Sequence, residues 1–176
     1  MKIHQPGDVS AKQPYALPPP QGVIDDIVVS RVVPEDERVW VPQQEQVWFR
    51  PLCLNVTHGY WMNLLRVRRS GVLTRHRHAG PVHGYVLKGR WYYAEHDWKA
   101  EAGSYVFEPP GLTHTLVVPD DVEEMITMFQ VNGAMIYCDP YGEPVGYDDV
   151  LSKVELCREH YRKAGLGADF VDQFIR

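Results

Sequence analysis

The distribution of hydrophobic and polar residues predicts a β protein over most of the chain. Between residues 23 and 139, short runs rich in β-branched and aromatic residues are separated by Gly, Pro, Asp and Asn at intervals of roughly ten residues. These runs are VIDDIVVSRVV, VWFRPLCLNV, GYWMNLLRVR, GVLTRHRH, GYVLKG, RWYYAEH, SYVFEP, THTLVVP and EEMITMFQVNGAMIYC. Gly89, Asn132 and Gly133 supply the positive φ that two hairpin turns require. Such spacing is typical of a sandwich or barrel.

The period of the pattern changes after residue 147. Apolar residues then recur at spacings of four, three and four, which is one face of a helix: Val150, Val154, Cys157 and Tyr161. Asp148 or Asp149 can cap the start of this helix, and Gly165 fits just past its end. The last segment, ADFVDQFIR, predicts a short second helix. We expect the longer helix to cover a sheet edge or to pack on a partner, and we assign it no catalytic role.

The elements divide the chain into three parts. Residues 1–22 contain five of the fourteen prolines and end in LPPPQG, which predicts an extended arm or a disordered tail. Residues 23–140 form the expected β-barrel, and residues 141–176 form a helical extension at the C-terminal end. With 176 residues, 44% of them hydrophobic, the chain can bury the core of one ordinary domain.

Charge and cysteine content exclude several classes of function. The net charge of −5 argues against a nucleic-acid partner, for which a basic stripe would be expected. One local run of arginines is interpreted as a solvated strand face: Arg66, Arg68, Arg69, Arg75 and Arg77. The three cysteines form no CxxC pair and are expected to be packing residues in a reducing compartment. No apolar run has the length of a signal peptide or a membrane span, so we expect a soluble cytoplasmic protein without a membrane partner.

Two histidines one residue apart are the first sign of a metal site. On a strand, residues two apart point to the same face, so His76 and His78 can direct both imidazoles at one point. Taken alone this pair is a weak signal. A solvated pair flanked by Arg75 and Arg77 is the alternative interpretation.

A second stretch, GSYVFEPPGLTHTLVV, adds a third histidine, and with it the chain resembles the cupin family. The second cupin motif, G-x5-P-x-G-x2-H-x3-N, is matched without a gap at four residues: Gly103, Pro109, Gly111 and His114. The first, G-x5-H-x-H-x3,4-E-x6-G, is matched with one residue fewer before the histidines and one fewer before the last glycine: Gly71, His76, His78 and Gly89. The resemblance covers residues 59–118 and implies an all-β, double-stranded β-helix. This jelly-roll barrel would carry the N-terminal arm and the C-terminal helix.

The resemblance also implies a ligand set of three histidines, His76, His78 and His114. Neutral imidazoles bind Fe, Zn, Cu, Ni or Mn and leave positions open for water or substrate. Two departures matter: the usual glutamate ligand falls at or beside His83, and the closing asparagine is Val118. His83 is either a fourth ligand or a pocket residue. We favour the pocket, because chemistry at a metal needs an open position.

The chain is similar to the cupin branch that includes zinc-binding anti-sigma domains, acetylacetone dioxygenases and 2,4'-dihydroxyacetophenone dioxygenases. The last group fits best in length, N-terminal arm and aromatic content. It implies a non-haem Fe(II) enzyme, with zinc as an alternative metal in the isolated protein. The reaction would be cleavage of an aryl α-hydroxyketone by O2 to 4-hydroxybenzoate and formate. Because cupins commonly pair through their outer strands, a homodimer or homotetramer is expected.

Further residues are candidates for the chemistry. Glu108 precedes the Pro-Pro-Gly turn, where it is either a general base or a solvated residue at a strand end. Four others are candidate pocket residues, able to stack on an aryl ring or hydrogen-bond a substrate: His83, Tyr85, Tyr93 and His96. Glu95 is a weaker candidate near the metal.

Other functions compete with the hydroxyketone dioxygenase. A β-diketone-cleaving dioxygenase of the same fold is one, and a zinc-binding sensor or regulatory domain is another. A metal-dependent isomerase or sugar-binding cupin is less favoured, because these usually keep the glutamate ligand and have more polar pockets.

Overall fold

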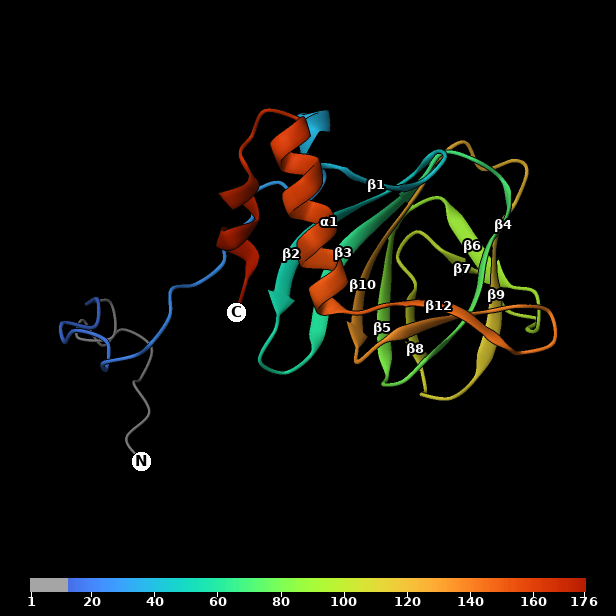
Figure 1. The fold of residues 1–176 in the computed structure, drawn as a ribbon, viewed down its shortest axis with the longest axis horizontal. Coiled ribbons are helices and arrows are strands. Elements are labelled where there is room, and N and C mark those ends of the chain that lie inside the picture. The colour runs from blue at the N-terminus through green and yellow to red at the C-terminus, as the bar shows by residue number, and fades with distance from the viewer. Residues whose placement is uncertain (1–12) are drawn as a thin grey trace.

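The computed structural model describes residues 13–176 and folds them into two facing six-stranded antiparallel sheets (Figure 1). The first sheet has the order β1 (Val41–Gln44), β2 (Val47–Asn55), β3 (Tyr60–Val67), β10 (Met125–Asn132), β5 (Val82–Lys88) and β8 (Tyr105–Glu108). The second has the order β12 (Pro144–Asp148), β11 (Met135–Cys138), β4 (Gly71–His78), β9 (Thr113–Val118), β6 (Arg90–Tyr93) and β7 (Ala100–Glu101). The arrangement is a jelly roll, as the all-β prediction required.

Every second side chain of the strands points inward, and these side chains fill the space between the two sheets. In β10, for example, Met125, Thr127, Phe129 and Val131 are all buried, as period-two alternation demands. The largest fully buried side chains are aromatic, Trp61, Trp91 and Tyr93 among them, and burying one such side chain stabilises the fold by about 1.5–3 kcal/mol. All three cysteines are free thiols, as expected.

Both predicted turns are present, but neither closes a hairpin, because β5 and β10 lie in the first sheet whereas β6 and β11 lie in the second. The first turn depends on glycine. Gly89 joins β5 to β6 with φ 70°. A Cβ atom added there would overlap the carbonyl oxygen of Glu124, so the position excludes any side chain sterically as well as conformationally. Gly133, with φ 76°, lies in the connection from β10 in the first sheet to β11 in the second.

The C-terminal part is helical as predicted. Helix α1 (Val150–Lys163) begins at Asp149, whose side chain accepts from Ser152 N in a capping box. Gly165 follows the helix with φ 76°. The helix packs against β1 and β2 (Figure 1), and the 3-10 helix η3 (Ala168–Phe174) packs against α1. None of the helices in residues 13–176 is long and apolar enough to cross a membrane.

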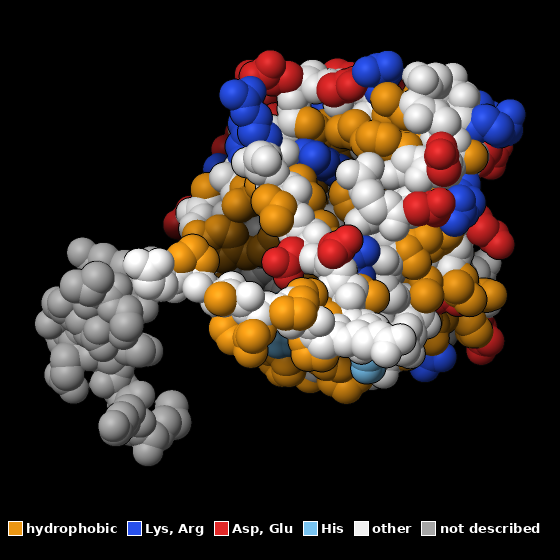
Figure 2. Space-filling model, turned by 90° about the vertical axis from the view of Figure 1, so that its left-hand side faces the viewer, with side chains coloured by type: hydrophobic (Ala, Val, Ile, Leu, Met, Phe, Trp, Pro, Cys, Tyr) orange, Lys and Arg blue, Asp and Glu red, His pale blue; other side chains and the backbone are white. Residues whose placement is uncertain are grey.

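Residues 23–33 do not form the strand that their sequence predicts. This segment forms a hydrogen bond with a side chain and not with a neighbouring strand: the Arg50 guanidinium donates to the carbonyl oxygen of Val32 at 2.6 Å. Ile27 and Val29 of this segment pack on the core, beside a hollow that Leu52 also lines. Figure 2 shows hydrophobic side chains gathered around such a hollow. Residues 13–22 also lack regular structure, and residues 1–12 of the expected arm lie outside the described part.

The limits of the strand region therefore differ from the predicted barrel of residues 23–140. The first strand starts at Val41, after a 3-10 turn, η2 (Glu37–Val39), and the last ends at Asp148. Three short strands, β1, β7 and β12, have too few hydrophobic residues to be recognised by alternation.

Arg66 is buried, contrary to the interpretation of the arginine run as solvated. Its guanidinium lies 4.2 Å and 4.7 Å from the ring centres of Trp40 and Trp48. It also donates two hydrogen bonds to the Glu37 carboxylate, at 2.9 and 2.6 Å. Arg66 therefore joins η2 to the outer face of the first sheet and is not available to a phosphate ligand.

We expect Gly89→Ala to destabilise the protein by about 3 kcal/mol or more, because it adds a steric clash to the cost of a positive φ. Gly103→Ala is the matched control: its φ is 94°, but nothing lies within 4 Å of the added Cβ. It should cost only about 1–2 kcal/mol. Urea denaturation of the two variants measures both values, and equal losses would show that the Glu124 contact is unimportant.

Candidate metal centre

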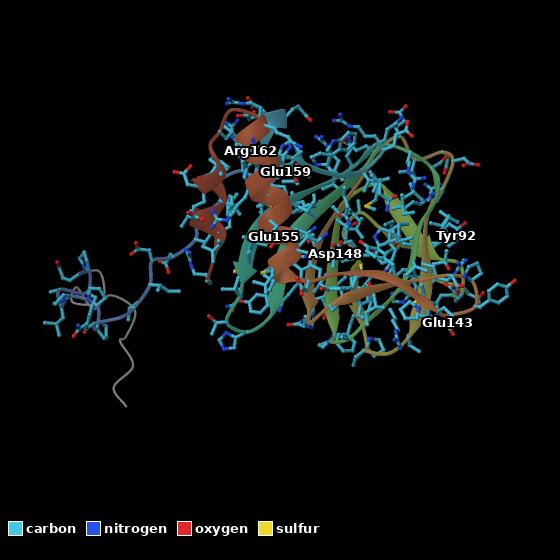
Figure 3. All side chains as sticks on the ribbon, viewed as in Figure 1. Tyr92, Glu143, Asp148, Glu155, Glu159 and Arg162 are labelled. Carbon is cyan, nitrogen blue, oxygen red and sulfur yellow. The ribbon has the colours of Figure 1, made fainter. Side chains whose placement is uncertain are left out.

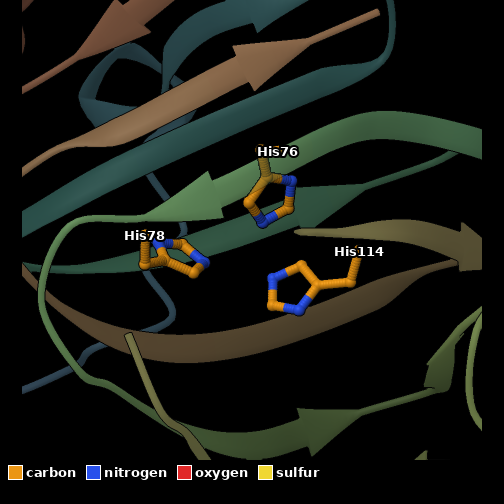
Figure 4. A group of neighbouring side chains, drawn as sticks. All are labelled: His76, His78 and His114. Atoms are coloured by element: carbon orange, nitrogen blue, oxygen red, sulfur yellow. The ribbon is translucent and has the colours of Figure 1, made fainter. Parts of the chain in front are cut away.

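Two neighbouring strands of the second sheet bring three histidines together. His76 on β4 lies directly opposite His114 on β9 in the antiparallel register. His78 follows two residues later on β4 and therefore points to the same side. The three side chains converge in Figure 4, and their candidate ligand atoms all lie within 4.8 Å of one another. All three are buried.

Hydrogen bonds around the histidines hold them in place. The Nδ1 atom of His76 lies 2.9 Å from Thr74 Oγ1, so Nε2 is left to face the centre. In the Pro-Pro-Gly turn after β8, Gly111 N donates to the carbonyl of His78 at 3.0 Å. Beside His114, Thr115 donates from both its backbone N and its Oγ1 to the Glu95 carboxylate, each at 2.7 Å. Glu95 therefore braces β9 at the residue next to His114.

Glu108 is buried at the centre, so it is not a solvated residue at a strand end. It is 3% exposed, and its Oε2 lies 3.1 Å from His78 Nε2 and 3.4 Å from His114 Nε2. This position at the end of β8 allows two roles, as a proton acceptor beside a metal or as a fourth ligand.

The polar atoms of the centre lack partners that a divalent metal would supply. Within residues 13–176, four of them are buried without a hydrogen bond: both carboxylate oxygens of Glu108, His114 Nε2 and His78 Nδ1. Buried polar atoms are nearly always satisfied in folded proteins, and leaving one unsatisfied costs about 1–3 kcal/mol. A metal ion bound by the three histidines would partner the Nε2 atom of His114 and bring a positive charge beside the Glu108 carboxylate, so the donor set fits a metal.

The same burial keeps two of the imidazoles, those of His76 and His114, neutral. Burial, followed by the neighbouring His78 and His114 rings, lowers the pKa of His76 well below its usual value. Burial also lowers the pKa of His114 to about 4, although the Glu108 carboxylate acts in the opposite direction. Only a neutral imidazole can bind a metal, so these shifts prepare the ligands at neutral pH.

A mainly apolar cavity adjoins the centre inside the barrel. His76, His78 and Glu108 line one part of it. Its walls are largely hydrophobic: Val47, Trp61, Leu65, Leu73, Leu116 and Phe129. The solvent-accessible volume of the cavity is about 70 Å³, several times what one water molecule requires.

Tyr93 is the one predicted pocket residue that lines this cavity. Its ring stacks on His114 with the ring centres 3.7 Å apart and the planes at 6°. Burial, followed by the Glu108 carboxylate, raises the pKa of Tyr93 well above its usual value, so its hydroxyl keeps the proton.

The other three predicted pocket residues lie elsewhere. In β5, Val82 faces the cavity, so by alternation His83 and Tyr85 face outward. The His83 Nδ1 atom is 2.8 Å from Tyr105 Oη on that outer face, away from the three converging histidines. His96 stacks on Trp98 in the loop after β6 and does not line the cavity.

Five polar residues line the cavity without having been predicted: Gln43, Gln44, Asn63, Thr74 and Lys153. Only Lys153 left a signal in the sequence. It comes three residues after Val150 and four before Cys157, so it falls on the apolar face of α1, where lysine is rare. Gln43 lies on β1, a strand that alternation did not detect.

Comparison with known proteins agrees with this architecture. A family model described as "ChrR Cupin-like domain" matches residues 29–135. The chain is also similar to an RmlC-like cupin protein from Ralstonia eutropha, with 26% identity and a TM-score of 0.69 over 72% of this chain and 83% of that one. An acetylacetone dioxygenase from Acinetobacter johnsonii shares the fold at 18% identity, with a TM-score of 0.64 over 78% and 97% of the two chains. None of the curated proteins matches the sequence.

We predict that His76→Ala, His78→Ala and His114→Ala each weaken metal binding at least about tenfold without unfolding the barrel. Even loss of a group that only orients a ligand has an effect of this size. His83→Ala, from the same segment but the outer face, is the matched control and should keep wild-type metal content. Metal analysis with circular dichroism tests this, and full occupancy in all three variants would refute the ligand set.

The metal-free protein should lose stability as the pH falls from about 6.5 towards 4. His76 and His114 have lower pKa values when folded than when unfolded, so unfolding takes up protons in this range. Above pH 6.5 the two imidazoles are neutral in both the folded and the unfolded protein, so they do not reduce the stability there. Below pH 6.5 the unfolded state binds protons first, and the stability falls. Urea midpoints between pH 7 and pH 4 should therefore fall less in a His76→Gln/His114→Gln variant than in wild type. Parallel curves would contradict the assignment.

Proposed function

Since the chain belongs to the family of ChrR cupin-like domains, we propose that it is a metal-dependent dioxygenase that cleaves an aryl α-hydroxyketone with O2. The observation that carries this proposal is the position of Glu108. Its unpartnered carboxylate lies beside the histidines and lines the same apolar cavity as they do. A buried base next to three imidazole ligands suits proton removal from a small apolar molecule.

The reaction balances without a further reductant. The bond between the carbonyl carbon and the hydroxymethyl carbon breaks, and each carbon becomes a carboxylic acid, so one O2 takes up the four electrons released. With 2,4'-dihydroxyacetophenone the products are 4-hydroxybenzoate and formate. Iron(II) is the proposed metal, and when bound it would supply Lewis acidity and electron transfer to O2.

The residues around the cavity have separate roles in this proposal. The Glu108 carboxylate accepts a proton from the hydroxymethyl group of the ketone. Tyr93, stacked on His114, keeps that ring in place and offers its own hydroxyl as a donor. The apolar walls exclude water and receive the aryl ring. Among these wall residues, Trp61 lies on β3 and Phe129 on the adjacent strand β10.

A second candidate function is a zinc-binding regulatory domain. The short distances from Glu108 to His78 and His114 support it, because three histidines and one carboxylate can close a tetrahedral zinc site. A closed site has no open position for substrate. The two candidates therefore assign Glu108 different roles, as a ligand in one and as a base in the other.

Substitution of Glu108 tests both candidates. If it is the base, Glu108→Gln should bind wild-type amounts of iron and consume O2 about 10²–10⁴-fold more slowly in single turnovers, because glutamine cannot accept the proton. If it is a ligand, the variant should instead lose metal as His78→Ala does. Wild-type iron together with a wild-type rate would refute a catalytic role.

A panel of substrates tests the reaction itself. We expect the Fe(II)-loaded protein to consume O2 with aryl α-hydroxyketones and to form one carboxylate and one formate per O2. β-Diketones and buffer alone are the controls, measured with an oxygen electrode and by product chromatography. Preference for β-diketones would reassign the substrate, and stoichiometric zinc without O2 uptake would favour the regulatory domain.

A further inference from the structure

The cavity contains a buried ion pair that the proposed chemistry does not use. Lys153 of α1 is 2% exposed and lines the cavity. Its Nζ donates to Asp148 Oδ2 at 2.8 Å and lies 4.7 Å from the ring centre of Phe49 and 5.9 Å from that of Trp61. Figure 3 shows Asp148 where the strand β12 leads into the helix. Lysine is almost never fully buried unless it is paired, so its place in a cavity wall requires a reason.

The carboxylate of this pair is already satisfied. Asp148 Oδ2 accepts from Tyr137 Oη at 2.6 Å and from Gln43 Nε2 at 3.4 Å as well as from Lys153. Its other oxygen accepts from Ser152 Oγ at 3.3 Å. An ammonium has three N–H donors, and Asp148 takes one of those of Lys153. Donor capacity at this wall therefore exceeds acceptor capacity, which suits a ligand that presents an oxygen acceptor.

The charge balance narrows the ligand further. Lys153 and Asp148 neutralise each other, so an added carboxylate would place two negative charges against one ammonium in an apolar cavity. Burying such an uncompensated charge is unfavourable. A neutral oxygen, such as a phenol hydroxyl, can accept from Lys153 without this cost. Gln43 lines the same cavity, and because its nitrogen donates to Tyr137 Oη at 3.1 Å, its amide oxygen can accept the phenol proton.

We propose that Lys153, held by Asp148, binds the ring hydroxyl of a phenolic ketone whose carbonyl end lies at the histidine centre. This inference rests on the proposed function and deepens it, since it names the group that selects the ring substituent. The apolar walls of the cavity receive the aromatic ring, and the buried Asn63 on β3 also lines the cavity. Lys153 is thus a specificity-determining residue and takes no part in breaking the bond.

Equilibrium binding to the zinc-loaded protein tests the proposal apart from turnover. The probes are 4-hydroxyphenyl methyl ketone, phenyl methyl ketone and 4-carboxyphenyl methyl ketone, none of which has the hydroxymethyl carbon that cleavage needs. By calorimetry, wild type should bind the hydroxyl probe about tenfold or more tightly than the phenyl probe, the usual gain from a hydrogen bond to a charged group. It should bind the carboxyl probe more weakly than either. Equal affinities, no binding, or preference for the carboxylate would overturn the proposal.

Variants then assign the preference to Lys153. Lys153→Met alone leaves Asp148 buried without its partner and can prevent folding, so the principal variant is Lys153→Met/Asp148→Asn, which removes both charges together. In this variant the preference for the hydroxyl probe should fall to about twofold or less. Lys163→Met, which breaks an exposed pair with Glu159 on the same helix, is the control and should keep the wild-type preference. A folded double variant with an unchanged preference would show that the pair is only structural.

The proposed reaction and the proposed role of Lys153 can be refuted independently of each other. If no ketone supports O2 uptake but the hydroxyl preference depends on Lys153, the cavity still binds phenolic ketones and only the reaction is wrong. If O2 uptake occurs at equal rates with and without the ring hydroxyl, in wild type and in the double variant, the reaction stands and the role of Lys153 is refuted.

Discussion

The antiparallel register between β4 and β9 is the constraint on which the candidate metal centre depends. It sets His76 opposite His114, and alternation within β4 then brings His78 to the same side. A slip of one residue would turn a strand's side chains to the opposite face, and the histidines on that strand would then leave the centre. The bonds from Thr115 to Glu95 and from Gly111 to the His78 carbonyl help to keep that register.

Burial of the centre has opposite effects on stability and on reactivity. Three imidazoles and a carboxylate in an apolar interior leave several polar atoms without partners, which destabilises the metal-free fold. The same surroundings keep His76 and His114 neutral and strengthen electrostatic interactions inside the cavity. Metal affinity and protein stability are therefore coupled, because one ion satisfies the atoms that folding has removed from water.

The second polar region of the cavity comes from a different part of the chain. Lys153 belongs to α1 and its partner Asp148 to β12, the strand before it. Both elements follow the histidine motifs in the sequence. The helix is thus more than a cover for the sheet, because it contributes a charged side chain to the interior. Its capping box at Asp149 and Ser152 positions the first turn from which Lys153 extends.

The sequence by itself determined the all-β architecture, most of the strands, the helix with its capping residue, and the three histidines, because these depend on local periodicity and on short motifs. It could not decide which of two alternating faces is inside. His83 and Tyr85 share a face that turned out to be the outer one, whereas Glu108, left open between solvent and cavity, is buried at the centre. Only the tertiary structure placed Lys153 in the cavity wall, since it brings this side chain of α1 to Phe49 and Trp61 of the barrel, which lie about a hundred positions earlier in the sequence, and no local pattern encodes such a contact.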